Sequence, residues 1–126
     1  MKDNVYFIDS NLIVKDTNRG LGVFTTKNIS SGTVIEHSPY SSCWKSTWQD
    51  TPENLRKIVF SHPKNNNNYV IGLGYISIYN HKDDNNAEWI TTEQGLLIKS
   101  LKNIYAGEEI FINYGDAYWS GGWPKY

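Results

Sequence analysis

The hydrophobic positions along the chain follow the alternation of β-strands more than the period of helices. Short runs of β-branched and aromatic residues are separated by turns that contain glycine or polar residues, and such runs predict strands. The predicted strands are Val5–Ile8, Leu12–Val14, Val23–Thr26, Thr33–Glu36, Tyr69–Tyr79, Glu88–Thr92, Leu96–Lys99 and Ile110–Tyr114. The segment 93–95 between two of these runs predicts a hairpin.

One segment instead has helical spacing. Thr51 is a suitable N-cap and is followed by a proline at the first helical position, while Leu55, Ile58 and Val59 fall on one face. Pro63 would end this helix after about three turns. Many short strands with one short helix predict a mostly β, β-rich α+β fold.

Composition limits the possible functions. The chain has 126 residues and a net charge of -1, which indicates one domain and argues against nucleic-acid binding through bulk positive charge. The single cysteine, Cys43, permits neither an intrachain disulfide nor a multi-cysteine zinc cluster. The N-terminal residues show no signal-peptide core, so we expect an intracellular protein, cytoplasmic or nuclear, with no membrane contact.

Two stretches carry candidate chemistry. In the segment 19–24, Gly20 and Gly22 would let the backbone approach a ligand, although an ordinary glycine turn explains them equally simply. After an apolar strand, Asn80 and His81, followed by Asn86, offer several hydrogen-bond donors and acceptors at one point. Such a pair more often satisfies backbone groups at a strand end. We expect no metal site, because the other histidines show no ligand spacing with His81.

A third stretch, residues 107–119, contains a turn, a strand and then aromatic residues around Gly115. These aromatic residues could be core packing, or they could wall a narrow channel.

In order and spacing, the three stretches together resemble the SET-domain protein-lysine methyltransferases. The opening pattern, G-x-G-V-F followed by a turn and a strand that ends in Glu, corresponds to Gly20–Glu36. The N-H-x4-N pattern corresponds to residues 80–86, and the G-E-E closing pattern to residues 107–115. The resemblance extends from Val5 to Trp119 and is greatest to minimal, single-domain SET proteins of viral type. It implies one domain over residues 1–126, with a core at about 5–119 and an aromatic tail at 120–126.

This resemblance implies S-adenosylmethionine as the methyl donor and a lysine-containing protein as the substrate. It implies that Tyr114 is catalytic, with its hydroxyl near the transferred methyl. The cofactor-binding residues would be Gly20, Leu21, Gly22, Asn80, His81, Tyr114 and Trp119. The substrate channel would include Tyr75, Tyr118 and Ile112. The family fold of small curved sheets has a threaded C-terminal segment, which would bring Tyr114 beside Asn80 and His81.

Some positions depart from the family pattern. Leu21 and Ile58 stand where aromatic residues occur in minimal SET proteins, and Lys82 and Asn85 alter the loop after His81. With Ile112, the first two departures leave room for more than one methyl group.

Two alternatives to an active enzyme therefore stay open. One is a SET-fold protein that binds cofactor or a partner without turnover, and the other is a plain β-rich interaction module. A basic tail, such as a histone tail, is a plausible substrate, and a homodimer is possible.

Overall fold

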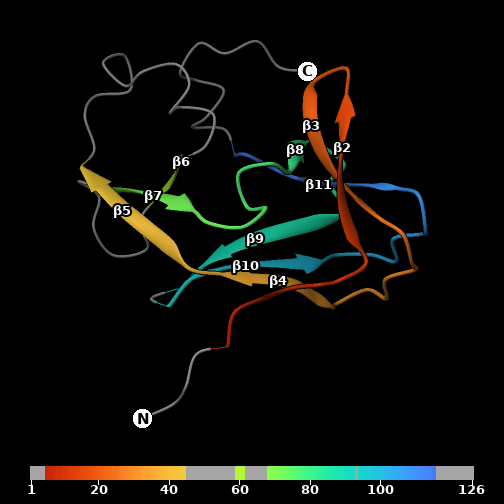
Figure 1. Ribbon diagram of the computed structural model, residues 1–126, viewed down its shortest axis with the longest axis horizontal. Helices are drawn as coiled ribbons and strands as arrows, with labels where there is room; N and C mark the ends of the chain where they lie inside the picture. Colours follow the sequence, from red (N-terminus) through yellow and green to blue (C-terminus); the bar gives the residue numbers. More distant parts are fainter. Residues whose placement is uncertain (1–4, 45–58, 62–67, 93, 116–126) are drawn as a thin grey trace.

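The computed structural model describes residues 5–44, 59–61, 68–92 and 94–115. The described residues form strands and no helix, which confirms the predicted mostly β character of the fold (Figure 1). The strands are β1 (Phe7–Ile8), β2 (Leu12–Thr17), β3 (Gly20–Thr25), β4 (Val34–Ser38), β5 (Tyr40–Trp44), β6 (Val59–Ser61), β7 (Asn68–Gly72), β8 (Asn80–His81), β9 (Ala87–Thr91), β10 (Leu96–Ser100) and β11 (Glu109–Ile112). Within these ranges, no helix is long and apolar enough to cross a membrane.

The strands form three small sheets. The first has the order β1-β4-β10-β9, the second β2-β3-β11-β8 and the third β5-β7-β6. In Figure 1 the first sheet crosses the lower part of the molecule, the β2–β3 hairpin stands upright at the right, and the third sheet lies at the left.

Strand β10 shows how the alternating pattern builds the first sheet. Leu96, Ile98 and Ser100 are buried, while the residues between them are partly exposed, because successive side chains of a strand point to opposite faces. β10 pairs with β9 in an antiparallel register that places Leu96 opposite Thr91. This pairing confirms the predicted hairpin.

The chain changes sheets at Pro39. β4 belongs to the first sheet, and β5, which begins directly after this proline, belongs to the third. The sequence pattern did not predict β5, because Tyr40–Trp44 has little regular alternation. The end of the predicted helix was also wrong: Val59 lies in β6, which pairs with β7. The rest of that helix, at 51–58, lies outside the described residues.

The predicted strand Tyr69–Tyr79 is only partly correct. It ends at Gly72, and residues 74–78 form a turn that leads to the short strand β8. Gly74 has a φ of 76°, and a Cβ at this position would lie 2.6 Å from a carboxylate oxygen of Glu36. The backbone conformation and this close contact both require glycine, and they convert a run of strand-forming residues into a turn.

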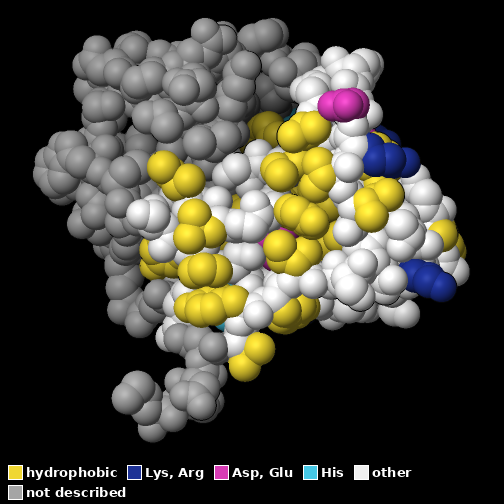
Figure 2. All heavy atoms as spheres, in the orientation of Figure 1, with side chains coloured by type: hydrophobic (Ala, Val, Ile, Leu, Met, Phe, Trp, Pro, Cys, Tyr) yellow, Lys and Arg dark blue, Asp and Glu magenta, His cyan; other side chains and the backbone are white. Residues whose placement is uncertain are grey.

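The core lies between the first two sheets. Ile35 and Ile98 from the first sheet and Val23, Ile110 and Ile112 from the second are all 0% exposed. Other hydrophobic side chains remain on the surface, and Figure 2 shows many of them gathered on the face that carries the first sheet. The second sheet is fixed to the core through β3 and β11, which carry these buried residues and are two of the strands around the candidate site.

Candidate active site

The candidate site lies where β3, β8 and β11 meet. β11 is antiparallel to β3 and parallel to β8, with Phe111 opposite Asn80 and Ile112 opposite His81. A parallel pair needs a long connection, so this contact joins parts of the chain that are far apart in sequence. It brings together the second and third sequence motifs, and β3 carries the first.

The two glycines of the first motif serve different purposes. Gly20 follows the tight β2–β3 turn with a φ of 99°, and a Cβ there would meet nothing within 4 Å. A Cβ on Gly22 would lie 2.6 Å from Oε2 of Glu109 and 3.0 Å from Nδ2 of Asn80. Gly22 is therefore needed for packing against two polar side chains, while Leu21 between the glycines is 51% exposed.

Asn80 is held with a defined orientation. Its Nδ2 donates to the Leu21 carbonyl at 3.0 Å and to Oε2 of Glu109 at 2.8 Å. Both neighbours accept hydrogen bonds only, so the nitrogen faces them and the amide oxygen points elsewhere. Asn80 is 8% exposed, and no described residue donates to its side-chain oxygen. The site thus offers a nearly buried acceptor beside the carboxylate of Glu109.

His81 is held on both sides of its ring. Nδ1 accepts a hydrogen bond from the Tyr114 backbone N–H at 2.9 Å, and Nε2 lies 2.8 Å from Oδ1 of Asp83. Since Nδ1 accepts, the ring proton belongs on Nε2, which donates to Asp83. The rings of His81 and Tyr114 have centroids 5.2 Å apart. This contact confirms the expectation that Tyr114 lies beside the Asn-His pair.

Asn86 completes the second motif by fixing β11. Its Nδ2 donates to the Glu109 carbonyl at 2.9 Å, and its Oδ1 accepts from the Phe111 N–H at 2.8 Å. One amide thereby satisfies two backbone groups of β11, and so sets the strand against the segment that carries His81.

The Tyr114 hydroxyl is also fixed. It donates to the Tyr79 carbonyl at 2.8 Å, and the side chain is partly buried against the core. Because its proton is directed at that carbonyl, the Tyr114 oxygen can act on a further group only as an acceptor.

The structure describes only two of the three predicted channel residues. Tyr75 is partly buried against the core, whereas Ile112 is 0% exposed and belongs to the core itself. Tyr118 and Trp119 lie outside the described residues. The channel roles of these residues, and the cofactor role of Trp119, stay predictions.

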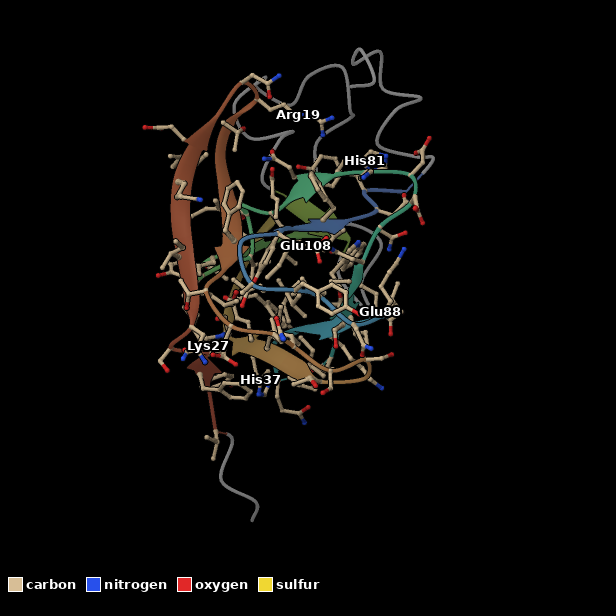
Figure 3. All side chains as sticks on the ribbon, turned by 90° about the vertical axis from the view of Figure 1, so that its right-hand side faces the viewer. Arg19, Lys27, His37, His81, Glu88 and Glu108 are labelled. Carbon is tan, nitrogen blue, oxygen red and sulfur yellow. The ribbon has the colours of Figure 1, made fainter. Side chains whose placement is uncertain are left out.

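Positive charge near His81 was not recognised in the sequence. The Arg19 Nη1 donates to the His81 carbonyl at 2.8 Å, and Figure 3 shows both side chains at the same end of the molecule. Arg19 and Lys82 both lie near the Phe111 ring, at 5.8 and 5.4 Å from its centroid. In the sequence, only the position of Arg19 in a predicted turn beside the first motif pointed to a role in the site. Its contact with His81 depends on how the fold brings the two segments together.

Glu109 and Glu36 were also missed as site residues. Glu109 was read as part of the closing motif and as an acidic residue that could attract a basic substrate, but not as the residue that holds Asn80. Glu36 was read as the last residue of the opening pattern and was given no role, yet its carboxylate accepts hydrogen bonds from Tyr75 and Tyr79. Among the described residues, no group of three His, Cys, Asp or Glu side chains could hold a metal ion.

Comparison with known proteins gives the family. The model of the SET domain family matches residues 20–115. The histone-lysine N-methyltransferase, H3 lysine-37 specific, of Schizosaccharomyces pombe is 31% identical over 117 residues, which cover 89% of this chain and 78% of that protein.

Solved structures show the same fold. A candidate histone methyltransferase from Plasmodium falciparum has a TM-score of 0.70 at 27% identity, over 89% of this chain and 99% of that one. Polycomb Repressive Complex 2 of Chaetomium thermophilum, bound to S-adenosylmethionine, has a TM-score of 0.68 at 20% identity, over 86% of this chain and 15% of that one. The chain, with its three motifs meeting at β3, β8 and β11, belongs to the SET domain family.

Proposed function

We propose that this protein transfers a methyl group from S-adenosylmethionine to the side-chain amine of a lysine in a protein substrate. The observation that carries the proposal is the convergence of Tyr114 with Asn80 and His81, where a fixed hydroxyl lies beside an oriented amide. Membership of the SET domain family and the relative named as a histone-lysine methyltransferase support the same activity.

The residues of the site suit this cofactor. S-adenosylmethionine supplies a methyl group on a positively charged sulfur, which makes that methyl open to attack by an amine. The nearly buried oxygen of Asn80, with the carboxylate of Glu109 beside it, suits the ammonium of the methionine portion. Arg19 and Lys82 would provide positive charge for its carboxylate.

The protein's chief contribution to the reaction is position. A free lysine has a pKa of about 10.4, so its reactive neutral form is scarce at pH 7 and burial has to favour it. The lysine ammonium would first lose a proton to water. Its neutral amine would then form the new N–C bond as the S–C bond breaks, and the electron pair of that bond would stay on sulfur. The Tyr114 oxygen would accept a weak C–H···O contact from the polarised methyl, because its own proton is held by Tyr79.

The substrate is proposed from charge and from the relatives. Glu108, just before β11, and Glu109, its first residue, are acidic and would favour a basic tail such as that of a histone. An intracellular location and a homodimer remain part of this proposal. The resemblance to viral-type minimal SET proteins and the possibility of more than one methyl group stay predictions.

A radiolabelled-methyl assay tests the proposal. Purified protein is incubated with labelled S-adenosylmethionine and with either histone tail peptides or a cell lysate. We expect label on lysine, and a fall of at least about 100-fold with Tyr114→Phe, which removes only the fixed hydroxyl. Cofactor binding in calorimetry without transfer by either form would instead indicate a binding module without turnover. Absence of binding would indicate a plain interaction module.

A further inference from the structure

Glu36 is a buried carboxylate that the proposed reaction does not use. It lies in β4, between β1 and β10, and is 0% exposed. No Lys or Arg among the described residues pairs with it. Burial raises the pKa of its carboxyl above the ordinary value of 4.5, and hydrogen bonds from Ser38, Tyr79 and Tyr75 offset part of that rise. A buried carboxylate without a cation is costly, so its presence here calls for a reason.

The three hydrogen bonds to Glu36 come from two separate segments. Ser38 Oγ, at 2.6 Å, belongs to the same strand. The Tyr75 backbone N–H, at 2.9 Å, and the Tyr79 hydroxyl, at 2.7 Å, belong to the turn at residues 74–78 and to the residue that follows it. One carboxylate therefore holds both ends of this turn.

The turn is fitted closely around the carboxylate. A Cβ on Gly74 would lie 2.6 Å from both Oε2 of Glu36 and Oγ of Ser38. Ile76 and Tyr79 are 0% and 1% exposed, so the turn is also anchored in the core. It has little freedom to move while these contacts persist.

The residue that Glu36 holds is the one that orients the Tyr114 hydroxyl. The Tyr79 side chain donates to Glu36, and the Tyr79 backbone carbonyl accepts from Tyr114 at 2.8 Å. We propose that Glu36 is a positioning residue for methyl transfer, which aims the Tyr114 hydroxyl by fixing Tyr79 and the turn before it. This inference rests on the proposed function for its kinetic consequence, although the positioning itself can be tested without turnover.

Tyr79→Phe is the principal variant, because it keeps the ring and the backbone carbonyl and removes only the hydroxyl that Glu36 holds. We expect kcat to fall about tenfold, since a slightly misplaced catalytic group costs rate, while KM for S-adenosylmethionine stays within about twofold. The matched control is Ser38→Ala, which removes a donor to the same carboxylate without touching Tyr79 and should keep kcat within about twofold.

A double-mutant cycle shows whether Tyr79 acts through Tyr114. In the Tyr114→Phe background there is no hydroxyl to aim, so adding Tyr79→Phe should change the remaining rate by less than about twofold. Independent, multiplicative losses in the double variant would overturn the proposal.

Two further variants address Glu36 itself. Glu36→Gln keeps an acceptor for Tyr75 and can donate to the Tyr79 oxygen, so it should retain most of the activity. Glu36→Ala leaves an unfilled space and can unfold the protein, so it is interpreted only where circular dichroism shows the native fold. A Glu36→Gln protein as inactive as a folded Glu36→Ala protein would contradict positioning through hydrogen bonds.

Carbon-13 NMR of the tyrosine ζ carbons gives a readout that needs no activity. The Tyr114 signal, assigned by its loss in Tyr114→Phe, should shift in Tyr79→Phe and remain in place in Ser38→Ala. An unchanged Tyr114 signal in Tyr79→Phe would refute the positioning role. Absence of methyl transfer by the wild type would refute only the proposed function.

Discussion

Two glutamates hold different residues of the candidate site: Glu36 holds Tyr79, which contacts Tyr114, and Glu109 holds Asn80. Glu36 is sealed in the protein and accepts hydrogen bonds only from neutral donors. Glu109 is partly buried and accepts from Asn80, whose side-chain oxygen accepts from no described residue. A sealed carboxylate can organise only the protein around it, whereas one at an opening can also attract a cation. Removing each should therefore affect different properties: stability for Glu36 and cofactor affinity for Glu109.

The largest expected effect is on stability. Glu36→Ala removes the acceptor of three buried donors, and should lower the free energy of unfolding by about 3 kcal/mol. Urea unfolding followed by tryptophan fluorescence measures this change. Glu109→Ala should lower it by less than about 1 kcal/mol, because its carboxylate is more exposed. Equal losses in the free energy of unfolding for Glu36→Ala and Glu109→Ala would mean that the two glutamates do not differ in their contribution to stability.

The next effect concerns the packing against Glu109. In Gly22→Ala, the new Cβ would lie 2.6 Å from Oε2 of Glu109 and displace both that carboxylate and Asn80. Affinity for S-adenosylmethionine in calorimetry should fall by about 2 kcal/mol, or roughly thirtyfold. Gly20→Ala is the matched control, since a Cβ there meets nothing and only the φ of 99° is strained. Gly20 is also a predicted cofactor-binding residue, so we expect Gly20→Ala to lower stability and to reduce the affinity less than Gly22→Ala does.

Charge alone should have a smaller effect. Glu109→Gln can still accept from Asn80 but no longer attracts an ammonium, so the affinity for S-adenosylmethionine should fall about tenfold. Glu108→Gln makes the same change in net charge one residue away, at an exposed side chain that accepts from the Tyr105 N–H. Similar losses in the two variants would mean that overall charge, rather than the contact with Asn80, sets the affinity.

The smallest effect is a pH dependence that separates the two glutamates. Because the pKa of Glu36 is raised on folding, the folded protein holds more protons than the unfolded chain above pH 4.5. The stabilisation from this proton is complete below pH 4.5 and is lost as the pH rises through the folded pKa. The free energy of unfolding, measured from pH 4.5 upward, should fall with rising pH in the wild type and in Glu109→Gln. In Glu36→Gln this fall should be absent.

The pattern of the sequence predicts the regular parts of the fold well. Strand β10 and its hairpin with β9 are visible in the alternation of Leu96 and Ile98, because one face of that sheet is buried. Strand β5 lacks such alternation. β6 lies where Val59 fitted a helical spacing, and pairing with β7 overrode it.

The site is less predictable from local pattern. The order of the three motifs indicated the family and the meeting of Tyr114 with His81, which the hydrogen bond between them confirms. The roles of Glu36, Glu109 and Arg19 depend on which atoms the fold brings together across the sheets. No spacing along the chain encodes those contacts.

The position of β11 has a consequence for how the protein is made. During synthesis β3 and β8 leave the ribosome before β11, the strand that lies between them and pairs with both. Until β11 arrives, the edge of β3 that faces away from β2 and the edge of β8 both lack their partner, and Asn80 lacks its carboxylate partner Glu109. Such late, non-local pairing slows folding and leaves edges open to association. A nascent chain that ends before residue 109 would expose an unpaired edge on each of β3 and β8 and would lack a completed site, so it would be open to association with other chains.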